Sequence, residues 1–150
     1  MENTCSVVNK TKATLPRLPL LSIKDDILGK KYFLSVAYVG EKISRELNKK
    51  WRGKDKPTNV LSFALRKNEG ELILCPSVVR KEAKNFGKSF DEFLGFLVIH
   101  GMLHLKGLDH SSTMEKAESK YDQKYFYRNR RRLGSDSSGG RRIRERRKNS

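Results

Sequence analysis

Short apolar runs alternate with polar and amphipathic segments along most of the chain. The runs at 32–39 (YFLSVAYV), 60–65 (VLSFAL) and 71–76 (ELILCP) predict strands, and so does the less apolar run CSVVNKT at 5–11. The run at 32–39 has apolar residues on both faces, which is typical of a strand that is buried on both sides. The polar segment KNEG between the runs at 60–65 and 71–76 predicts a β-hairpin over 60–75.

Five segments have the spacing of helices: near 20–29, 41–51, 77–87, 89–107 and 111–129. In the second, Ile43 and Leu47 are four residues apart, as on the buried face of an amphipathic helix. In the third, Ser77 is the expected N-cap and Gly87 lies just past the expected end.

The segment 89–107 gives the clearest helix signal. Ser89 and Glu92 form a capping box, and the run that follows is apolar on nearly every face, which predicts a central, buried helix. Ser112 and Glu115 suggest a second capping box at the start of the last helix. Together these elements predict an α+β fold, in which a small mixed sheet of about four strands is packed with helices.

The composition fits one domain with a polyanionic partner. Of the 150 residues, 36% are hydrophobic and 33% charged, with a net charge of +16 and a pI of about 10.1. Such a balance indicates nucleic acid, or an anionic membrane as the weaker candidate. Residues 128–150 hold ten Lys/Arg and two acidic residues around the sequence GSDSSGG. We therefore predict a folded domain over 1–127, followed by a basic, disordered tail.

The start of the chain, MENTCSVVNKTK, is polar and lacks the apolar stretch of a signal peptide. No run approaches the roughly 20 apolar residues of a membrane span. We expect a soluble, cytoplasmic protein that does not associate with membranes. In that compartment Cys5 and Cys75 would remain thiols, with Cys75 a small buried hydrophobe.

All three histidines of the chain lie within HGMLHLKGLDH, at His100, His104 and His110. The first two are four residues apart, so on a helix they project from one face, and Gly107 allows the chain to turn back toward them. A lone histidine on an apolar helix is more often a core residue. Three imidazoles that converge and leave a fourth tetrahedral position open form the ligand set of a catalytic zinc site, with one Zn²⁺ per chain.

The spacing is that of the metzincin proteases, H-E-x-x-H-x-x-G-x-x-H, with one difference. Where those enzymes carry a glutamate as general base, this chain has Gly101. No side chain at that position can accept a proton from a metal-activated water, which argues against a peptidase.

The segment HGMLHLKGLDH resembles the signature H-G-x-L-H-L-x-G-[hydrophobic]-D-H of the YbeY family of metal-dependent endoribonucleases. LNKKWRGKDKPTNVLSFAL at 47–65 and GELILCPSVV at 70–79 are similar to two further blocks of that family, in the same order. The resemblance covers roughly 32–127. The chain departs from the family pattern at Ala64, at Leu108 and in its long basic tail.

This resemblance implies a zincin-like fold whose central helix holds the metal. It also implies a single-strand-specific, zinc-dependent endoribonuclease of rRNA maturation, notably at the 16S rRNA 3′ end, and of ribosome quality control. Its partners would be RNA and the ribosome or small subunit. The resemblance places Arg52 in the cleft, where a guanidinium could clamp a phosphate, whereas from composition alone Arg52 is a solvated helix-end cation. Asp109 could accept a hydrogen bond from a ligand imidazole or cap the turn.

Two other functions share some of these features. A metallopeptidase would use the same histidines, and a non-catalytic RNA- or ribosome-binding factor would close a structural metal site with a fourth ligand such as Cys75. For an endoribonuclease without a glutamate base, two nucleophiles remain. One is a water activated by the metal, which we favour, and the other is the 2′-hydroxyl of the RNA.

Overall fold

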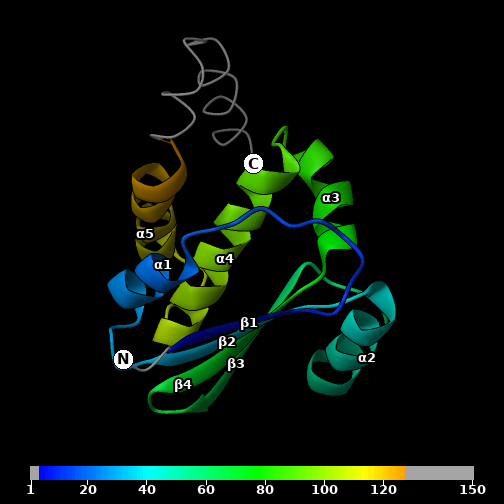
Figure 1. Ribbon diagram of the computed structural model, residues 1–150, viewed down its shortest axis with the longest axis horizontal. Helices are drawn as coiled ribbons and strands as arrows, with labels where there is room; N and C mark the ends of the chain where they lie inside the picture. Colours follow the sequence, from blue (N-terminus) through cyan, green and yellow to red (C-terminus); the bar gives the residue numbers. More distant parts are fainter. Residues whose placement is uncertain (1–3, 128–150) are drawn as a thin grey trace.

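The computed structural model describes residues 4–127, which form a mixed sheet crossed by one long helix (Figure 1). The strands are β1 (Cys5–Asn9), β2 (Phe33–Tyr38), β3 (Val60–Arg66) and β4 (Glu69–Leu74). The helices are α1 (Leu20–Ile27), α2 (Glu41–Arg52), α3 (Pro76–Asn85), α4 (Phe90–Lys106) and α5 (Ser112–Asp122), and a π-helical turn (Gln123–Tyr127) follows. The predicted basic tail at 128–150 lies outside the described residues.

The four strands are arranged in the order β1-β2-β4-β3. β1 and β4 both pair with β2 in parallel, and β3 pairs with β4 in antiparallel fashion. The predicted hairpin is therefore confirmed as β3–β4, with Val60 opposite Leu74 and a register shift between Ala64 and Arg66. The α+β class and the mixed four-stranded sheet are confirmed as well.

The two faces of the sheet are covered unequally. The main core, shared with α1 and α4, takes alternate strand residues: Leu34, Val36, Leu72 and Leu74. The opposite face carries a small buried cluster: Val39, Leu61 and Ile73. Leu47 of α2 packs against that cluster. Phe33 remains 46% exposed, so the prediction that its strand is buried on both faces is wrong, because one helix is too small to cover the whole second face.

The buried positions of α2 are polar. Ser44 and Asn48 are buried, whereas Ile43 is 39% exposed, so the prediction that Ile43 marks the buried face is wrong. The Ser44 hydroxyl donates to the Thr58 carbonyl and accepts from the Thr58 amide, both at 2.9 Å. The Asn48 amide donates to the Lys56 carbonyl at 2.8 Å. The helix buries these side chains because the loop that follows it has backbone groups that need partners.

A buried lysine ties the first strand to the first helix. Lys24 of α1 is fully buried. Its ammonium donates to the Thr4 hydroxyl at 2.8 Å and to the Gly29 and Lys30 carbonyls at 3.1 and 3.2 Å. These bonds offset the cost of removing the charge from water.

The N-termini of α3 and α5 differ in detail from the predictions. α3 begins with Pro76 at its first position, and the Ser77 hydroxyl donates to the Glu41 carboxylate of α2 instead of capping the helix. The N-cap of α5 is Ser111, one residue before the predicted Ser112. Both helices start within a residue or two of the predicted positions.

Both predicted ends of α4 are confirmed. Ser89 and Glu92 make the two reciprocal bonds of a capping box, and Gly107 ends the helix with a left-handed φ of 104°. The helix is buried along most of its 17 residues. Over residues 4–127, no helix has the combination of length and apolar character that crossing a membrane requires.

α4 packs closely against the sheet at Gly101. A Cβ atom at this position would lie 2.7 Å from Leu72 Cδ2 and 3.1 Å from the Ser62 hydroxyl oxygen. That hydroxyl donates to the Gly101 carbonyl at 3.1 Å. A side chain at position 101 would point into the packed sheet. Close packing against the sheet is therefore a reason for glycine at the position where metzincins carry their glutamate base.

We predict that Gly101→Ala destabilises the protein by about 1–3 kcal/mol, because the added methyl group overpacks the contact with Leu72. The free energy of unfolding in urea measures this loss. In a Leu72→Val background, where the clashing methyl group is removed, the same substitution should cost less. An equal cost in both backgrounds would place the strain elsewhere.

Candidate metal centre

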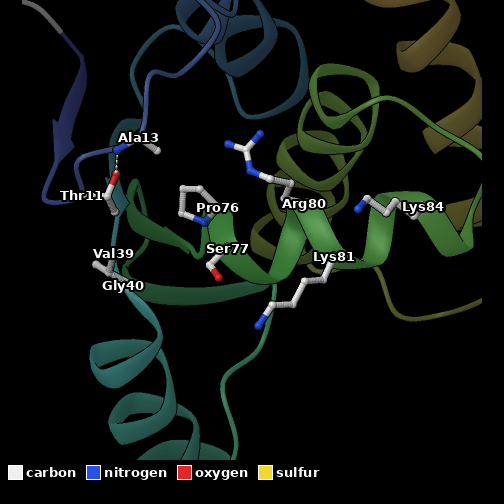
Figure 2. A pocket seen from close by; sticks show the side chains of 9 residues that line it. All are labelled: Thr11, Ala13, Val39, Gly40, Pro76, Ser77, Arg80, Lys81 and Lys84. Atoms are coloured by element: carbon white, nitrogen blue, oxygen red, sulfur yellow. Dashed lines mark hydrogen bonds between the residues drawn. The ribbon is translucent and has the colours of Figure 1, made fainter.

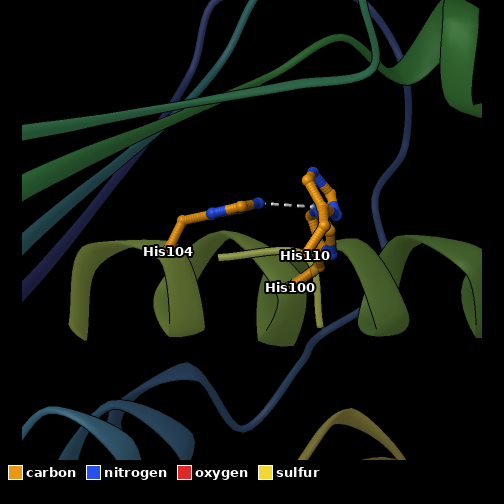
Figure 3. A group of neighbouring side chains, drawn as sticks. All are labelled: His100, His104 and His110. Atoms are coloured by element: carbon orange, nitrogen blue, oxygen red, sulfur yellow. Dashed lines mark hydrogen bonds between the residues drawn. The ribbon is translucent and has the colours of Figure 1, made fainter. Parts of the chain in front are cut away.

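The three histidines converge on one point beside α4 (Figure 3). His100 and His104 come from successive turns of α4, and His110 comes from the loop after Gly107. The ring centroids lie 4.5, 4.9 and 5.2 Å apart, and one nitrogen of each ring lies within 4.8 Å of the others. The group could therefore hold a metal ion.

The hydrogen bonds of two rings determine which nitrogens face the centre. His104 Nδ1 lies 3.1 Å from the Leu108 carbonyl, and His100 Nδ1 lies 2.5 Å from the Glu118 carboxylate. Because a carbonyl or a carboxylate accepts a hydrogen bond, each Nδ1 carries the proton and each Nε2 presents a lone pair. These tautomers are assigned from the partners.

The two Nε2 atoms approach each other to 3.1 Å. With both protons on Nδ1, two lone pairs face each other at this distance, which is repulsive unless a cation lies between them. The donor set therefore fits a divalent cation with nitrogen ligands. Among the described residues, neither cysteine and no carboxylate belongs to the group.

Burial favours the neutral form of one ligand. The pKa of His104 is lowered, first because the ring is removed from solvent and then because His100 and His110 are close by. In the metal-free protein a proton therefore competes less well for His104 than for an exposed imidazole. Neutral imidazole is the form that binds metals.

Glu118 is the residue of this centre that the sequence analysis missed. It lies on α5, it is buried, and its carboxylate orients His100. Asp109, one candidate for such a role, is exposed, and within residues 4–127 it makes no hydrogen bond to a histidine. The only sequence signal for Glu118 is its place four residues after Met114, which is buried on the same face of α5.

A cleft of about 830 Å³ opens beside the centre. Its lining comes from α3, α4 and α5 and from the segments next to them, and includes Phe86, Lys88, Phe96, His100, Glu118 and Ser119. Because His100 is part of this wall, a metal ion held by the histidines would be next to whatever the cleft binds.

A smaller hollow of about 340 Å³ lies on another face of α3 (Figure 2). Arg80, Lys81 and Lys84 project from α3 around it. Arg80 lies over the ring of Phe90 at 4.2 Å, and Lys81 pairs with Glu41 at 3.0 Å. None of His100, His104 and His110 lines this hollow, whereas His100 lines the cleft.

Arg52 is the last residue of α2, and its side chain is exposed. It makes no hydrogen bond or ion pair with any residue of 4–127, the histidines included. The preceding Trp51 packs edge-on against Phe63 of the edge strand β3, with ring centroids 5.9 Å apart. The end of α2 that carries Arg52 is therefore close to β3, a strand that α4 also contacts.

Comparison with known proteins gives consistent matches. The family model described as Endoribonuclease YbeY matches residues 5–129. The chain is 36% identical over 120 residues to Endoribonuclease YbeY of Lactobacillus helveticus, with 68% of this chain and 69% of that protein covered. It is 39% identical over 97 residues to Endoribonuclease YbeY of Staphylococcus carnosus, with 57% of this chain and 63% of that protein covered.

A solved structure also matches. The solution structure of TM1509 from Thermotoga maritima superposes with a TM-score of 0.59 at 30% sequence identity. The match covers 89% of this chain and 97% of that protein.

We predict that Glu118→Gln weakens zinc binding about 10- to 100-fold, because the amide still accepts the His100 proton but no longer carries the charge that makes the ring a better ligand. Competition with a chromogenic chelator measures the affinity. Glu115→Gln is the matched control, because Glu115 is exposed on the same helix and lines the same cleft. A similar loss in both variants would contradict a specific role for Glu118.

Proposed function

The chain belongs to the YbeY family of endoribonucleases, and on this basis we propose that it is a zinc-dependent endoribonuclease that cleaves single-stranded regions of ribosomal RNA. The observation that carries the proposal is the cluster of His100, His104 and His110, which opens on a cleft. The net charge of +16 supports a polyanionic substrate.

The finer parts of the proposal follow the family. We place the reaction in rRNA maturation, notably at the 16S rRNA 3′ end, and in ribosome quality control, with the ribosome or small subunit as partner in the cytoplasm. The catalytic domain would span 1–127. Residues 128–150, with ten Lys/Arg and two acids, would add electrostatic affinity for RNA without selecting a sequence.

Zinc suits three imidazole ligands and an open fourth position, with one ion per chain. When bound, the cation would supply a Lewis acid that lowers the pKa of water and stabilises charge on phosphate oxygens. The protein supplies the orientation of the ligands. Glu118 and the Leu108 carbonyl hold the Nδ1 protons of His100 and His104, which leaves both Nε2 atoms available to the ion.

The two rival functions have less support. A peptidase of the metzincin type needs a base at position 101, and that position faces Leu72 and Ser62 of the sheet instead of the cleft. A purely structural metal site needs a fourth protein ligand. Cys75, the candidate for that ligand, is a buried free thiol outside the histidine group.

The experiment that tests the proposal combines metal analysis with cleavage of a labelled single-stranded RNA by the full chain. We expect about one zinc per chain in the wild type, and His104→Ala should lose zinc together with more than about 100-fold in cleavage rate. Lys116→Ala, at an exposed position on α5, is the control. Cleavage by His104→Ala at the wild-type rate would exclude the histidine centre.

The ends of the products test the nucleophile in the same assay. If water attacks, the products carry no 2′,3′-cyclic phosphate, and RNA with a 2′-O-methyl group at the scissile nucleotide is still cut. A cyclic phosphate, or failure to cut the methylated RNA, would assign the attack to the 2′-hydroxyl instead.

For Arg52 we predict a role in stabilising charge at phosphorus. Arg52→Ala should lower kcat about 100-fold and leave zinc affinity unchanged, because its partner would be charge that develops in the transition state. Arg52→Lys should be intermediate, because an ammonium cannot bind two phosphate oxygens in the bidentate manner of a guanidinium.

Arg45→Ala is the matched control for Arg52→Ala. It removes an exposed cation from the same helix, one that pairs with Asp55 at 2.7 Å. If the two alanine variants lose activity equally, the effect is one of general charge and the specific role of Arg52 is excluded.

A further inference from the structure

Four aromatic rings form a row that ends at the metal centre. Phe86 stacks on Phe93 with ring centroids 5.0 Å apart and an interplanar angle of 27°. Phe93 and Phe96 follow at 6.4 Å and 8°, and Phe96 and His100 at 6.2 Å and 24°. The rings are thus close to parallel, and the last of them is one of the three clustered imidazoles.

The outer ring of the row is exposed. Phe86 is 43% exposed, whereas Phe93 behind it is buried. Phe86 follows directly on α3, and Gly87, with a φ of 64°, then turns the chain toward α4. The ring is therefore supported from behind and lines the cleft with its exposed part. An exposed phenylalanine has a cost in water, so a flat apolar ligand that covers it would gain free energy.

The described residues that line the cleft include one lysine, Lys88, and three glutamates, Glu82, Glu115 and Glu118. The Lys88 ammonium lies 4.1 Å from the ring centre of Phe96 and 6.0 Å from that of Phe93, which places a positive charge beside the row. Ser119 and Glu115 of α5 line the same cleft. A hydroxyl and a carboxylate can bond the donor and acceptor groups on the edge of an unpaired base, while aromatic rings bind its face.

We propose that this cleft is a nucleobase-binding subsite, in which an unpaired base near the cleavage site stacks on Phe86 while Lys88 faces a phosphate between that base and the scissile bond. The inference rests on the proposed function and adds the side chains that select single strands. A base within a duplex is already stacked and paired, so it can reach Phe86 only after it is extruded, which costs free energy. Stacking on an aromatic side chain tolerates any base, because every base has an aromatic face.

The test is an abasic scan with the full chain. A single-stranded RNA with one cleavage site is compared with a series of versions of the same RNA. Each version lacks one base, and the series covers several positions on both sides of the cleavage site. For the wild type, one position should lose about tenfold in kcat/KM when its base is removed, which is the size expected for one stacked base. That position identifies the nucleotide bound in the cleft.

Variants of Phe86 then connect this position with the cleft. Phe86→Leu should lose about tenfold on the intact RNA and show no further loss on the RNA that lacks the critical base, because the same contact is missing in both. Phe86→Tyr should stay within about twofold of the wild type, because it keeps the ring. Phe33→Leu, which makes the same change at a ring of similar exposure on β2, should behave as the wild type.

The outcomes separate this inference from the proposed function. The subsite is excluded, and the proposed endoribonuclease activity is retained, in either of two cases in which the wild type cleaves RNA. In the first, the losses in kcat/KM from Phe86→Leu and from base removal multiply. In the second, Phe86→Leu cleaves at the wild-type rate. If no RNA is cleaved, the proposed function fails, and RNA binding then tests whether the subsite exists. RNA with 2-aminopurine at successive positions should then be quenched by the wild type and not by Phe86→Leu. An absence of quenching with both would exclude a base subsite.

Discussion

The close contact between α4 and the sheet at Gly101 positions the helix that carries His100 and His104. The absence of a side chain at 101 lets the helix backbone approach Leu72 and accept a hydrogen bond from Ser62. Once this contact sets the depth and rotation of α4, the helical period fixes the direction of the side chains on either side of it. His100 and His104 are therefore placed by the packing of the core, on an element that is rigid because it is buried.

The imidazole cluster adds an electrostatic constraint to this packing. Three rings gather where the pKa of His104 is lowered by burial, and two Nε2 lone pairs face each other at 3.1 Å. Glu118 and the Leu108 carbonyl maintain this arrangement by fixing the opposite side of each ring. The free energy needed to bring the three rings together is thus supplied by folding. A cation that binds there removes the repulsion between the lone pairs and adds ligand bonds.

The interfaces around the sheet combine apolar packing with buried polar tethers. α2 buries Ser44 and Asn48, whose bonds hold the loop between α2 and β3, and Lys24 ties β1 to the end of α1. These side chains satisfy backbone groups that no strand or helix pairs. The loop held by α2 directly follows Arg52, so the same tethers limit where that guanidinium can reach.

Local pattern in the sequence determined the elements of this protein and the ligand triad. Apolar runs, the hairpin turn, the capping box at Ser89 and the glycine stop at Gly107 are signals carried by neighbouring residues, and all four are confirmed. The spacing of the three histidines is also a local signal, because one helix and the loop at its end bring all three rings together.

Only the tertiary structure decided which polar side chains would be buried and which partners would meet. Lys24 and Ser44 look like surface residues in the sequence, because burial depends on backbone groups that arrive from elsewhere in the chain. Glu118 reaches His100 only because α5 packs on α4, and Asp109, adjacent to a ligand in sequence, does not. The row of rings from Phe86 to His100 likewise needs α3 and α4 to meet at a fixed angle. Residue spacing encodes geometry within one element, whereas contacts between elements follow from how the whole core packs.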